Sequence, residues 1–263
     1  MKPQQKISGT PESVPQAKLS PVGASFNFAC HPGLDCFTVC CRQLDLGLTP
    51  YDILCLKKVL GLKARRFLDD YTEPAPAQSE RWPMLKLKMD ESADSACPFL
   101  EPKGCTVYAH RPSACRIYPL GRAARRGLGP GEVKEEYFVV EEAHCHGLAQ
   151  EQSWAVKDWT VDQGLLPCNE FNDRWMEIVT HPTGPGEGEV GEKKRQMFSL
   201  ASYNLDRFRE FVTQTRFLSL FDLAAGRADR VREDDEELLS LALDWMAFSF
   251  FGEGVLRARS PQP

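Results

Sequence analysis

Cysteine is the residue type in this chain whose number and spacing could do chemistry. The 263 residues include ten cysteines. Four lie in "ACHPGLDCFTVCCRQ" (29–43), three follow at 97–115 with the spacing C-x7-C-x9-C, and one lies in "HCHG" (144–147). These eight candidate metal ligands are Cys30, Cys36, Cys40, Cys41, Cys97, Cys105, Cys115 and Cys145. Zinc and iron–sulfur clusters prefer thiolate ligands and take about four each, so the sequence predicts one such site or two.

Two of these cysteines, Cys40 and Cys41, are adjacent. Neighbouring side chains on an extended segment point to opposite sides. The two cysteines are therefore expected to bind two different ions, or to act as one ligand and one packing residue, and not to chelate a single ion together. The alternatives are a vicinal disulfide or two buried thiols. Spacing alone leaves these open, as it leaves open the choice between one site and two.

Basic residues and turn formers surround the cysteines. Thiolates bound to a metal leave negative charge, which arginine can compensate while donating hydrogen bonds, and the candidates for this role are Arg42, Arg111 and Arg116. Prolines and Gly104 next to the second cluster predict that loops carry the ligands. His146 is a candidate substitute ligand, although a lone histidine is more often a surface or core residue.

Short elements must position these ligands. Thr49, Pro50, Asp52 and Gly61 predict the start and end of a helix over 49–61, in which Cys55 reads as a small buried hydrophobe. Alternation predicts strands at 82–90 and 133–140, and "GLGPGE" (127–132) predicts the hairpin loop before the second.

Helical patterns dominate from Ser153 onward. We expect one helix to end at Gly164, a Gly and Pro rich linker at 181–192, and apolar stripes on three further faces. The stripe residues are Phe171, Trp175 and Ile178; Phe198, Ala201, Leu205, Phe208 and Val212; and Leu238, Leu241, Trp245 and Phe248. The predicted fold is therefore α+β: a disordered tail (1–25), a loop-rich cysteine-cluster domain with short strands (26–150) and a helical extension (151–263).

Composition excludes several classes of function. The net charge of -5 and the scattered Lys and Arg give no basic surface for nucleic acid. The sequence has no apolar run long enough for a membrane span, and the first 25 residues lack the apolar core of a signal peptide. We therefore expect a cytoplasmic protein. Because the cytosol keeps thiols reduced, clustered cysteines there favour metal binding or catalysis over disulfides.

The same residues resemble the YkgJ-type cysteine-cluster family, which is described as a zinc- or iron-chelating domain. The resemblance covers about 26–147 and is carried by "FACHPGLDCFTVCC", "LTPYDI", "CPFLEPKGCTVYAHRPSACRIYPL" and "HCHG". The first cluster departs from the family pattern C-x2-C-x2-C-C, and Cys55 and Cys168 match no motif position. A similar module in flagellin lysine N-methylases, associated with an iron–sulfur cluster, implies an enzymatic alternative by analogy.

Three functions remain open at this stage. The first is a metal-binding protein whose cysteines hold an iron–sulfur cluster or zinc, with iron favoured because C-x2-C zinc knuckles are absent. The second is an iron–sulfur enzyme for methyl transfer or redox chemistry, although the C-x3-C-x2-C loop of radical S-adenosylmethionine enzymes is missing. The third is a thiol redox or metal-handling protein. The sequence identifies no catalytic residue, substrate, protein partner or oligomeric state.

Overall fold

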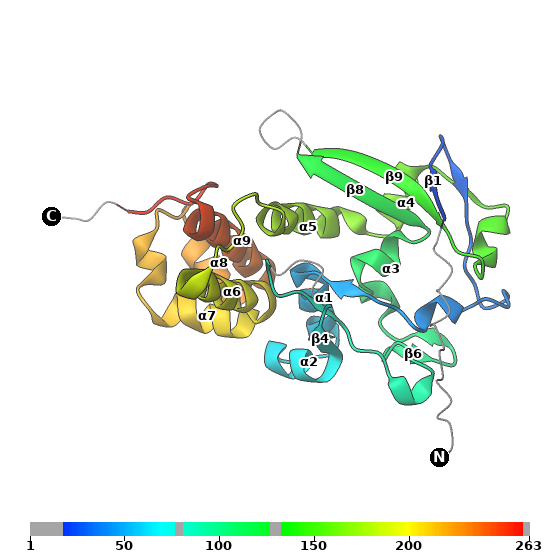
Figure 1. The fold of residues 1–263 in the computed structure, drawn as a ribbon, viewed down its shortest axis with the longest axis horizontal. Helices are drawn as coiled ribbons and strands as arrows, with labels where there is room; N and C mark the ends of the chain where they lie inside the picture. The colour runs from blue at the N-terminus through cyan, green and yellow to red at the C-terminus, as the bar shows by residue number, and fades with distance from the viewer. Residues whose placement is uncertain (1–17, 77–80, 127–132, 260–263) are drawn as a thin grey trace, which may run out of the picture.

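The computed structural model describes residues 18–76, 81–126 and 133–259. Short strands and loops occupy one end of the molecule, and the C-terminal helices gather at the other (Figure 1). The predicted α+β class is confirmed. No helix in the described parts of the chain has the length and apolar character needed to span a bilayer.

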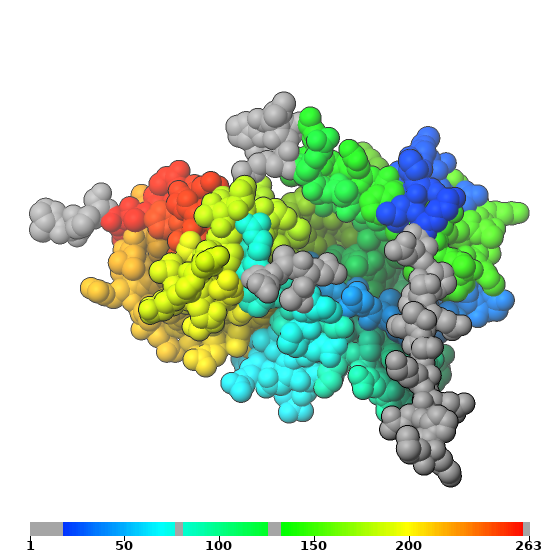
Figure 2. Space-filling view, viewed as in Figure 1, coloured from blue at the N-terminus to red at the C-terminus, as the bar shows by residue number. Residues whose placement is uncertain are grey.

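The largest sheet is antiparallel and has the strand order β1-β9-β8. Its strands are β1 (Lys18–Pro21), β8 (Leu120–Arg126) and β9 (Val133–Glu141). The predicted strand at 133–140 is confirmed, whereas the predicted hairpin loop at 127–132 lies outside the described residues. The expected disordered tail (1–25) is wrong for 18–21, because these residues pair with the open edge of β9. In Figure 2 the blue N-terminal segment lies against the green part of the chain.

Three smaller sheets hold the loops in place. β3 (Gly47–Leu48) and β4 (Thr72–Pro74) flank β5 (Leu85–Leu87), β2 (Phe26–Asn27) pairs with β10 (Ser153–Trp154), and β6 (Leu100–Glu101) pairs with β7 (Gly104–Cys105). The strand predicted at 82–90 is therefore shorter than expected. The predicted segment ends at Asp90, because the Asp90 carboxylate accepts a hydrogen bond from Ser92 N–H and caps a 3-10 turn.

Helix α1 (Pro50–Val59) begins and ends as predicted. Thr49 Oγ1 accepts from Asp52 N–H at 3.2 Å, and the Asp52 carboxylate accepts from Thr49 N–H at 3.0 Å, which forms a capping box. Gly61 follows the helix with a φ of 65°, a conformation that glycine adopts without strain. Two further helices of this half are α2 (Ala64–Tyr71) and α3 (Ser113–Ile117).

The C-terminal half packs amphipathic helices around a shared core. These are α4 (Val156–Asp162), α5 (Leu165–Val179), α6 (Gly188–Tyr203), α7 (Leu205–Gln214), α8 (Arg227–Glu233) and α9 (Asp235–Phe251). The predicted stripe residues are buried in it, except that Phe248 is half-buried. Gly164 ends α4 as expected, and Asp234 caps α9 by accepting from Glu236 N–H and Glu237 N–H.

Two expectations for this half need correction. Ser153 and Trp154 form strand β10 and not the first turn of a helix, because they pair with β2. The linker predicted at 181–192 ends at Glu187, since Gly188 already begins α6. The remaining short elements are the 3-10 turns η1 (Val39–Cys41), η2 (Glu91–Ala93), η3 (Tyr108–His110), η4 (His146–Ala149) and η5 (Phe217–Leu220).

Two apolar cores support the molecule. The large core includes Leu48 and Phe67 from the first half together with Trp175 and Phe208 from the second. The small core contains Phe26, Phe28, Leu120 and Trp159, and Cys145 packs against it, whereas Cys97, Cys105 and Cys115 pack against the large core. The large core includes side chains from both sides of residue 150. Packing therefore does not mark a separate domain on each side, and the predicted domain boundary at residue 150 stays a prediction.

Candidate metal centre

The first cysteine loop is irregular and tightly turned. Successive backbone N–H groups bond to carbonyls three residues earlier, from Leu34 N–H to His31 O at 3.1 Å through to Cys41 N–H to Thr38 O at 3.0 Å. The 3-10 turn η1 then carries Cys40 and Cys41. All ten cysteines are free thiols, Cys30 is exposed, and Cys168 is buried.

One group of thiols gathers Cys30, Cys36, Cys40 and Cys145, which we call the first thiol group. Burial and the nearby thiolates of Cys40, Cys36 and Cys145 raise the pKa of the Cys30 thiol to about 11. The loop that carries Cys145 is held against this group by two bonds, from Ala29 N–H to Gly147 O at 3.1 Å and from His146 N–H to Cys36 Sγ at 3.3 Å. Residues more than a hundred positions apart therefore meet here.

The other four thiols, Cys41, Cys97, Cys105 and Cys115, form the second thiol group. Cys97 N–H donates to Cys41 O at 2.8 Å, and Cys105 pairs with Leu100 across β6 and β7. Burial and the thiolates of Cys97 and Cys105, together with the Asp52 carboxylate, raise the pKa of Cys115 to about 12. The eight candidate ligands thus divide into four and four.

The division falls between the adjacent cysteines. The Cys40 thiol donates a hydrogen bond to the Cys41 sulfur, which lowers the pKa of Cys41 against burial and against the nearby thiolates of Cys97, Cys115 and Cys105. That bond and burial raise the pKa of Cys40. Each member of the pair therefore lies near a different set of thiols.

Backbone N–H groups point at two sulfurs of the second thiol group. Burial raises the pKa values of Cys97 and Cys105, while hydrogen bonds from Phe99 N–H and Val107 N–H respectively oppose that rise. Gly104 makes the second turn feasible with a φ of 118°, and a Cβ there would lie 3.3 Å from Phe37 Cζ. N–H donors of this kind stabilise thiolates and suit a metal-bound sulfur.

The predicted arginines occupy different places. Arg111 opposes the pKa rise at Cys30, Cys105 and Cys115, and its Nε donates to Cys115 O at 3.3 Å. Arg116 fixes the loops instead, donating to Arg111 O at 2.9 Å and to Gln163 O at 2.9 Å. Arg42 is exposed and donates to Ala93 O at 3.0 Å.

Asp52 ties α1 to the short helix that carries Cys115. Its buried carboxylate accepts from Ser113 N–H at 2.8 Å, at the start of α3. Burial raises the pKa of Asp52, although bonds from Ser113 and Thr49 oppose the rise. Asp52, the acidic member of the capping box, therefore also positions the helix that carries Cys115. The capping pattern in the sequence does not indicate this second role.

A buried hydroxyl lies beside the first thiol group. Tyr118 Oη is buried, and both the Cys145 thiol and the Glu142 carboxylate lie beside it. Burial raises the pKa of Tyr118, and these two neighbours raise it further. The hydroxyl can donate to a Cys145 sulfur that has lost its proton to a metal. A buried donor beside Cys145 fits a metal-bound thiolate at this position.

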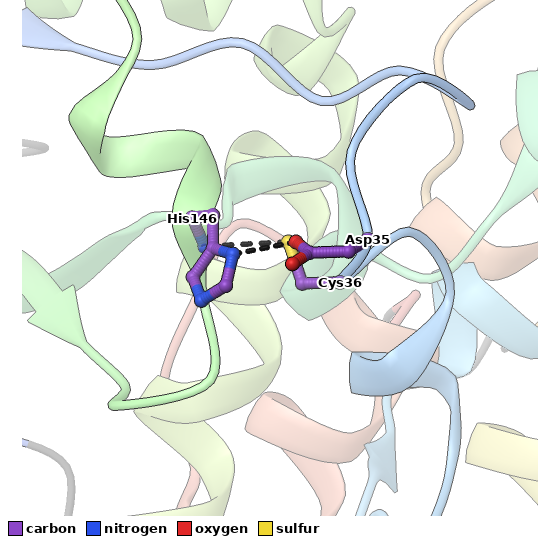
Figure 3. Close-up of side chains that lie close together, drawn as sticks. All are labelled: Asp35, Cys36 and His146. Atoms are coloured by element: carbon purple, nitrogen blue, oxygen red, sulfur yellow. Dashed lines mark hydrogen bonds and ion pairs between the residues drawn. The ribbon is translucent and has the colours of Figure 1, made fainter.

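The closest set of candidate ligand atoms is mixed and exposed. In the described parts of the chain, the only three His, Cys, Asp or Glu ligand atoms that all lie within 4.8 Å of one another belong to Asp35, Cys36 and His146. His146 Nδ1 lies 2.6 Å from Asp35 Oδ1, and both face Cys36 (Figure 3). The sequence marked His146 as a candidate ligand but gave no signal for Asp35.

Cys55 and Cys168 lie apart from both thiol groups. They are near each other and near Asp52, and burial raises their pKa values to about 11 and about 12. Cys168 is in the large core, and Cys55 packs against it. This placement agrees with the interpretation of Cys55 as a small hydrophobic residue.

Comparison with known proteins identifies the cysteine-rich stretch. Residues 29–146 match the family model CxxCxxCC, described as "Putative zinc- or iron-chelating domain". The match agrees with the resemblance of the motifs to a cysteine-cluster family, and zinc or iron chelation is the function by which that family model is described. No curated protein and no solved structure gives a significant match.

Proposed function

We propose that this protein holds two metal centres, one in each thiol group, and that each is an iron–sulfur cluster. The observation that carries the proposal is that the adjacent cysteines have different neighbours: Cys40 lies near Cys30, and Cys97 N–H donates to Cys41 O at 2.8 Å, so that each group counts four sulfurs. Four thiolates are what either an iron–sulfur cluster or a structural zinc ion takes. The zinc- or iron-chelating description of the domain supports metal binding in general.

Sulfur spacing supports a cluster over a single ion. Four sulfurs at roughly 2.3 Å from one zinc lie about 3.8 Å from one another. No three cysteine sulfurs in the described residues all lie within 4.8 Å of one another. A cluster distributes its iron atoms over a larger volume and takes one thiolate on each corner iron, so wider spacing suits it.

The surroundings of the sulfurs fit charged, metal-bound thiolates. Donors point at them from Phe99 N–H, Val107 N–H and His146 N–H, and Arg111 supplies positive charge to both groups. When bound, an iron–sulfur cluster supplies one-electron redox chemistry, which hydrogen bonds to sulfur tune. The protein's part is to fix the thiolates and set that electrostatic environment. A reducing cytoplasm would keep the ten free thiols available.

An iron–sulfur enzyme is the second candidate. It is favoured by the exposure of the first thiol group, where Asp35 and His146 face solvent beside Cys36. An iron with a replaceable ligand at that corner would be open to a substrate. A cluster held by three cysteines in the first group, with Cys36→Ser retaining iron, would support the enzyme over a purely structural or electron-carrying role.

The test is metal analysis of protein purified without oxygen. We expect iron and acid-labile sulfide with visible absorption, at about two clusters per chain. Cys105→Ser and Cys145→Ser should each lose the content of one group, while Cys55→Ser and Cys168→Ser, the matched controls, should retain all of it. Colourless protein that carries zinc would overturn the cluster proposal but retain the two centres. Metal-free protein would overturn both.

A further inference from the structure

Two side chains beside the first thiol group, Asp35 and His146, link the two loops that carry its cysteines, with His146 Nδ1 at 2.6 Å from Asp35 Oδ1. Their side chains are 79% and 53% exposed. Cys36 is half-buried and belongs to the first thiol group as well. Its sulfur therefore stands between the other thiols of that group and a carboxylate and an imidazole in contact with solvent (Figure 3).

Backbone contacts keep this arrangement in place. Beyond the bond from His146 N–H to Cys36 Sγ, β2 pairs with β10, and Phe28 N–H donates to Gln152 O at 2.8 Å. Gly147 lets the two loops approach, because a Cβ there would lie 2.7 Å from Phe28 Cε2 and 2.8 Å from Ala29 O. The approach of His146 to Cys36 is thus set by the fold.

We propose that Asp35, Cys36 and His146 form an exchange site, through which the ferrous iron bound by Cys36 enters and leaves the cluster of the first thiol group. The proposal rests on the iron–sulfur cluster proposed above for that group. Thiolate, imidazole and carboxylate together suit ferrous iron. A site with three protein ligands leaves a coordination position for water or an incoming ligand, whereas four-thiolate sites are closed.

The exchange site lowers the barrier by replacing ligands in steps. A corner iron that leaves the cluster loses its bonds to the cluster sulfides, and water compensates them poorly. With a carboxylate oxygen of Asp35 and a ring nitrogen of His146 both within 4.8 Å of Cys36 Sγ, the iron would keep its bond to Cys36 and gain two further ligands as the sulfides release it. Loss of one ferrous ion would leave a three-iron cluster with its four sulfides, so no iron or sulfur is oxidised or reduced.

The test follows the transfer of metal from the full-length holoprotein to an excess of a coloured chelator. We compare Asp35→Asn and His146→Gln with the parent and with His144→Gln, which removes an exposed histidine of the same loop that pairs with Glu142. The expected result is that one kinetic phase slows about tenfold in Asp35→Asn and His146→Gln. Their metal content should equal that of the parent, and His144→Gln should behave like the parent.

Three results would overturn the exchange site. They are parent-like release from Asp35→Asn and His146→Gln, equal slowing in His144→Gln, and a reduced metal content in Asp35→Asn or His146→Gln, which would make these residues resident ligands. Failure of the metal proposal itself is distinguishable, because the parent would then carry no metal before the chelator is added.

Discussion

Cys40 and Cys41 are neighbours in the chain, yet Cys40 lies near Cys30 and Cys41 lies with Cys97. The hydrogen bond between their thiols makes the two groups direct neighbours. If each group holds a metal, one peptide unit links the two centres. Single substitutions within this pair should then affect the centres one at a time.

Cys40→Ser should remove the metal of the first thiol group, and Cys41→Ser that of the second. Each variant should retain about half of the parent's metal, because serine is a poor ligand for the soft ions that thiolates bind. Elemental analysis with visible spectroscopy would measure this. Loss of all metal from either variant would instead indicate one shared centre.

Tyr118→Phe should change the metal environment without emptying the site. The buried hydroxyl is a donor beside Cys145 and Glu142, and hydrogen bonds to sulfur raise the reduction potential of a cluster. We expect a lower potential for one centre with unchanged metal content and fold, measured by redox titration. Tyr137→Phe, on the neighbouring strand β9, is the control, since its hydroxyl bonds to Glu135 at 3.1 Å. Equal potentials in all three proteins would remove Tyr118 from this role.

Gly147→Ala should weaken the first thiol group selectively. The added Cβ would overlap Phe28 and Ala29 O, so the Cys145 loop must move away, at a cost of about 1–3 kcal/mol. We expect a lower melting temperature and metal loss from the first group only. Gly186→Ala is a weaker control, because that Cβ meets no atom within 4 Å but its φ is 82°. A full metal complement in Gly147→Ala would contradict the expectation.

Local signals predicted much of this fold, and non-local pairing explains most of the errors. The capping box of α1 depends on residues within three positions and occurs as expected, and the cap of α9 by Asp234 is equally local. Strand β1 was missed because Lys18 and Ser20 are polar and find their partner, Glu141, only after more than a hundred residues. Local composition therefore resembled a tail.

The same distinction applies to the candidate site. The types and clustering of the cysteines are visible in the sequence, and divergence of adjacent side chains led us to expect separate roles for Cys40 and Cys41. The membership of each group is not visible, because Cys145 reaches Cys36 through the pairing of β2 with β10. Asp35 and Tyr118 gave no signal, since an exposed aspartate and a tyrosine before proline are ordinary residues until their neighbours are known.

Removal of the metal should unfold one end of the molecule and leave the other. Loops hold the thiol groups, and the small core beneath the Cys145 loop has only a few buried side chains, so ligand bonds must supply much of the cohesion there. Cys97, Cys105 and Cys115 pack against the edge of the large core, whose buried side chains come mostly from residues 165 onward. After treatment with a chelator, we expect amide exchange to rise across 29–146 outside α1 while α9 stays protected. Unchanged protection and melting temperature would contradict a structural role for the metal.

Acid should weaken the junction between the two halves. Lys57 of α1 is 7% exposed at its side chain and pairs with Asp206 at 3.1 Å and with Asp235 at 3.1 Å. Burial alone would raise the pKa of Asp206, but hydrogen bonds from Ala64 N–H and Lys57 lower it on balance. A carboxyl whose pKa is lower in the folded state adds stability above its unfolded pKa of about 4, and that stability is lost as the pH falls through the folded value.

Asp206→Asn should therefore lower the free energy of unfolding by about 1–2 kcal/mol at pH 7. The loss of stability on acidification should also be shallower than in the parent, because one carboxylate that favours folding at higher pH is gone. Urea unfolding at several pH values from about 7 to about 3 would measure both effects. Asp229→Asn, at an exposed position of α8, is the matched control and should keep the parent's acid dependence. A parallel decline in Asp206→Asn and parent would show that folding does not lower the pKa of Asp206, and would contradict the prediction.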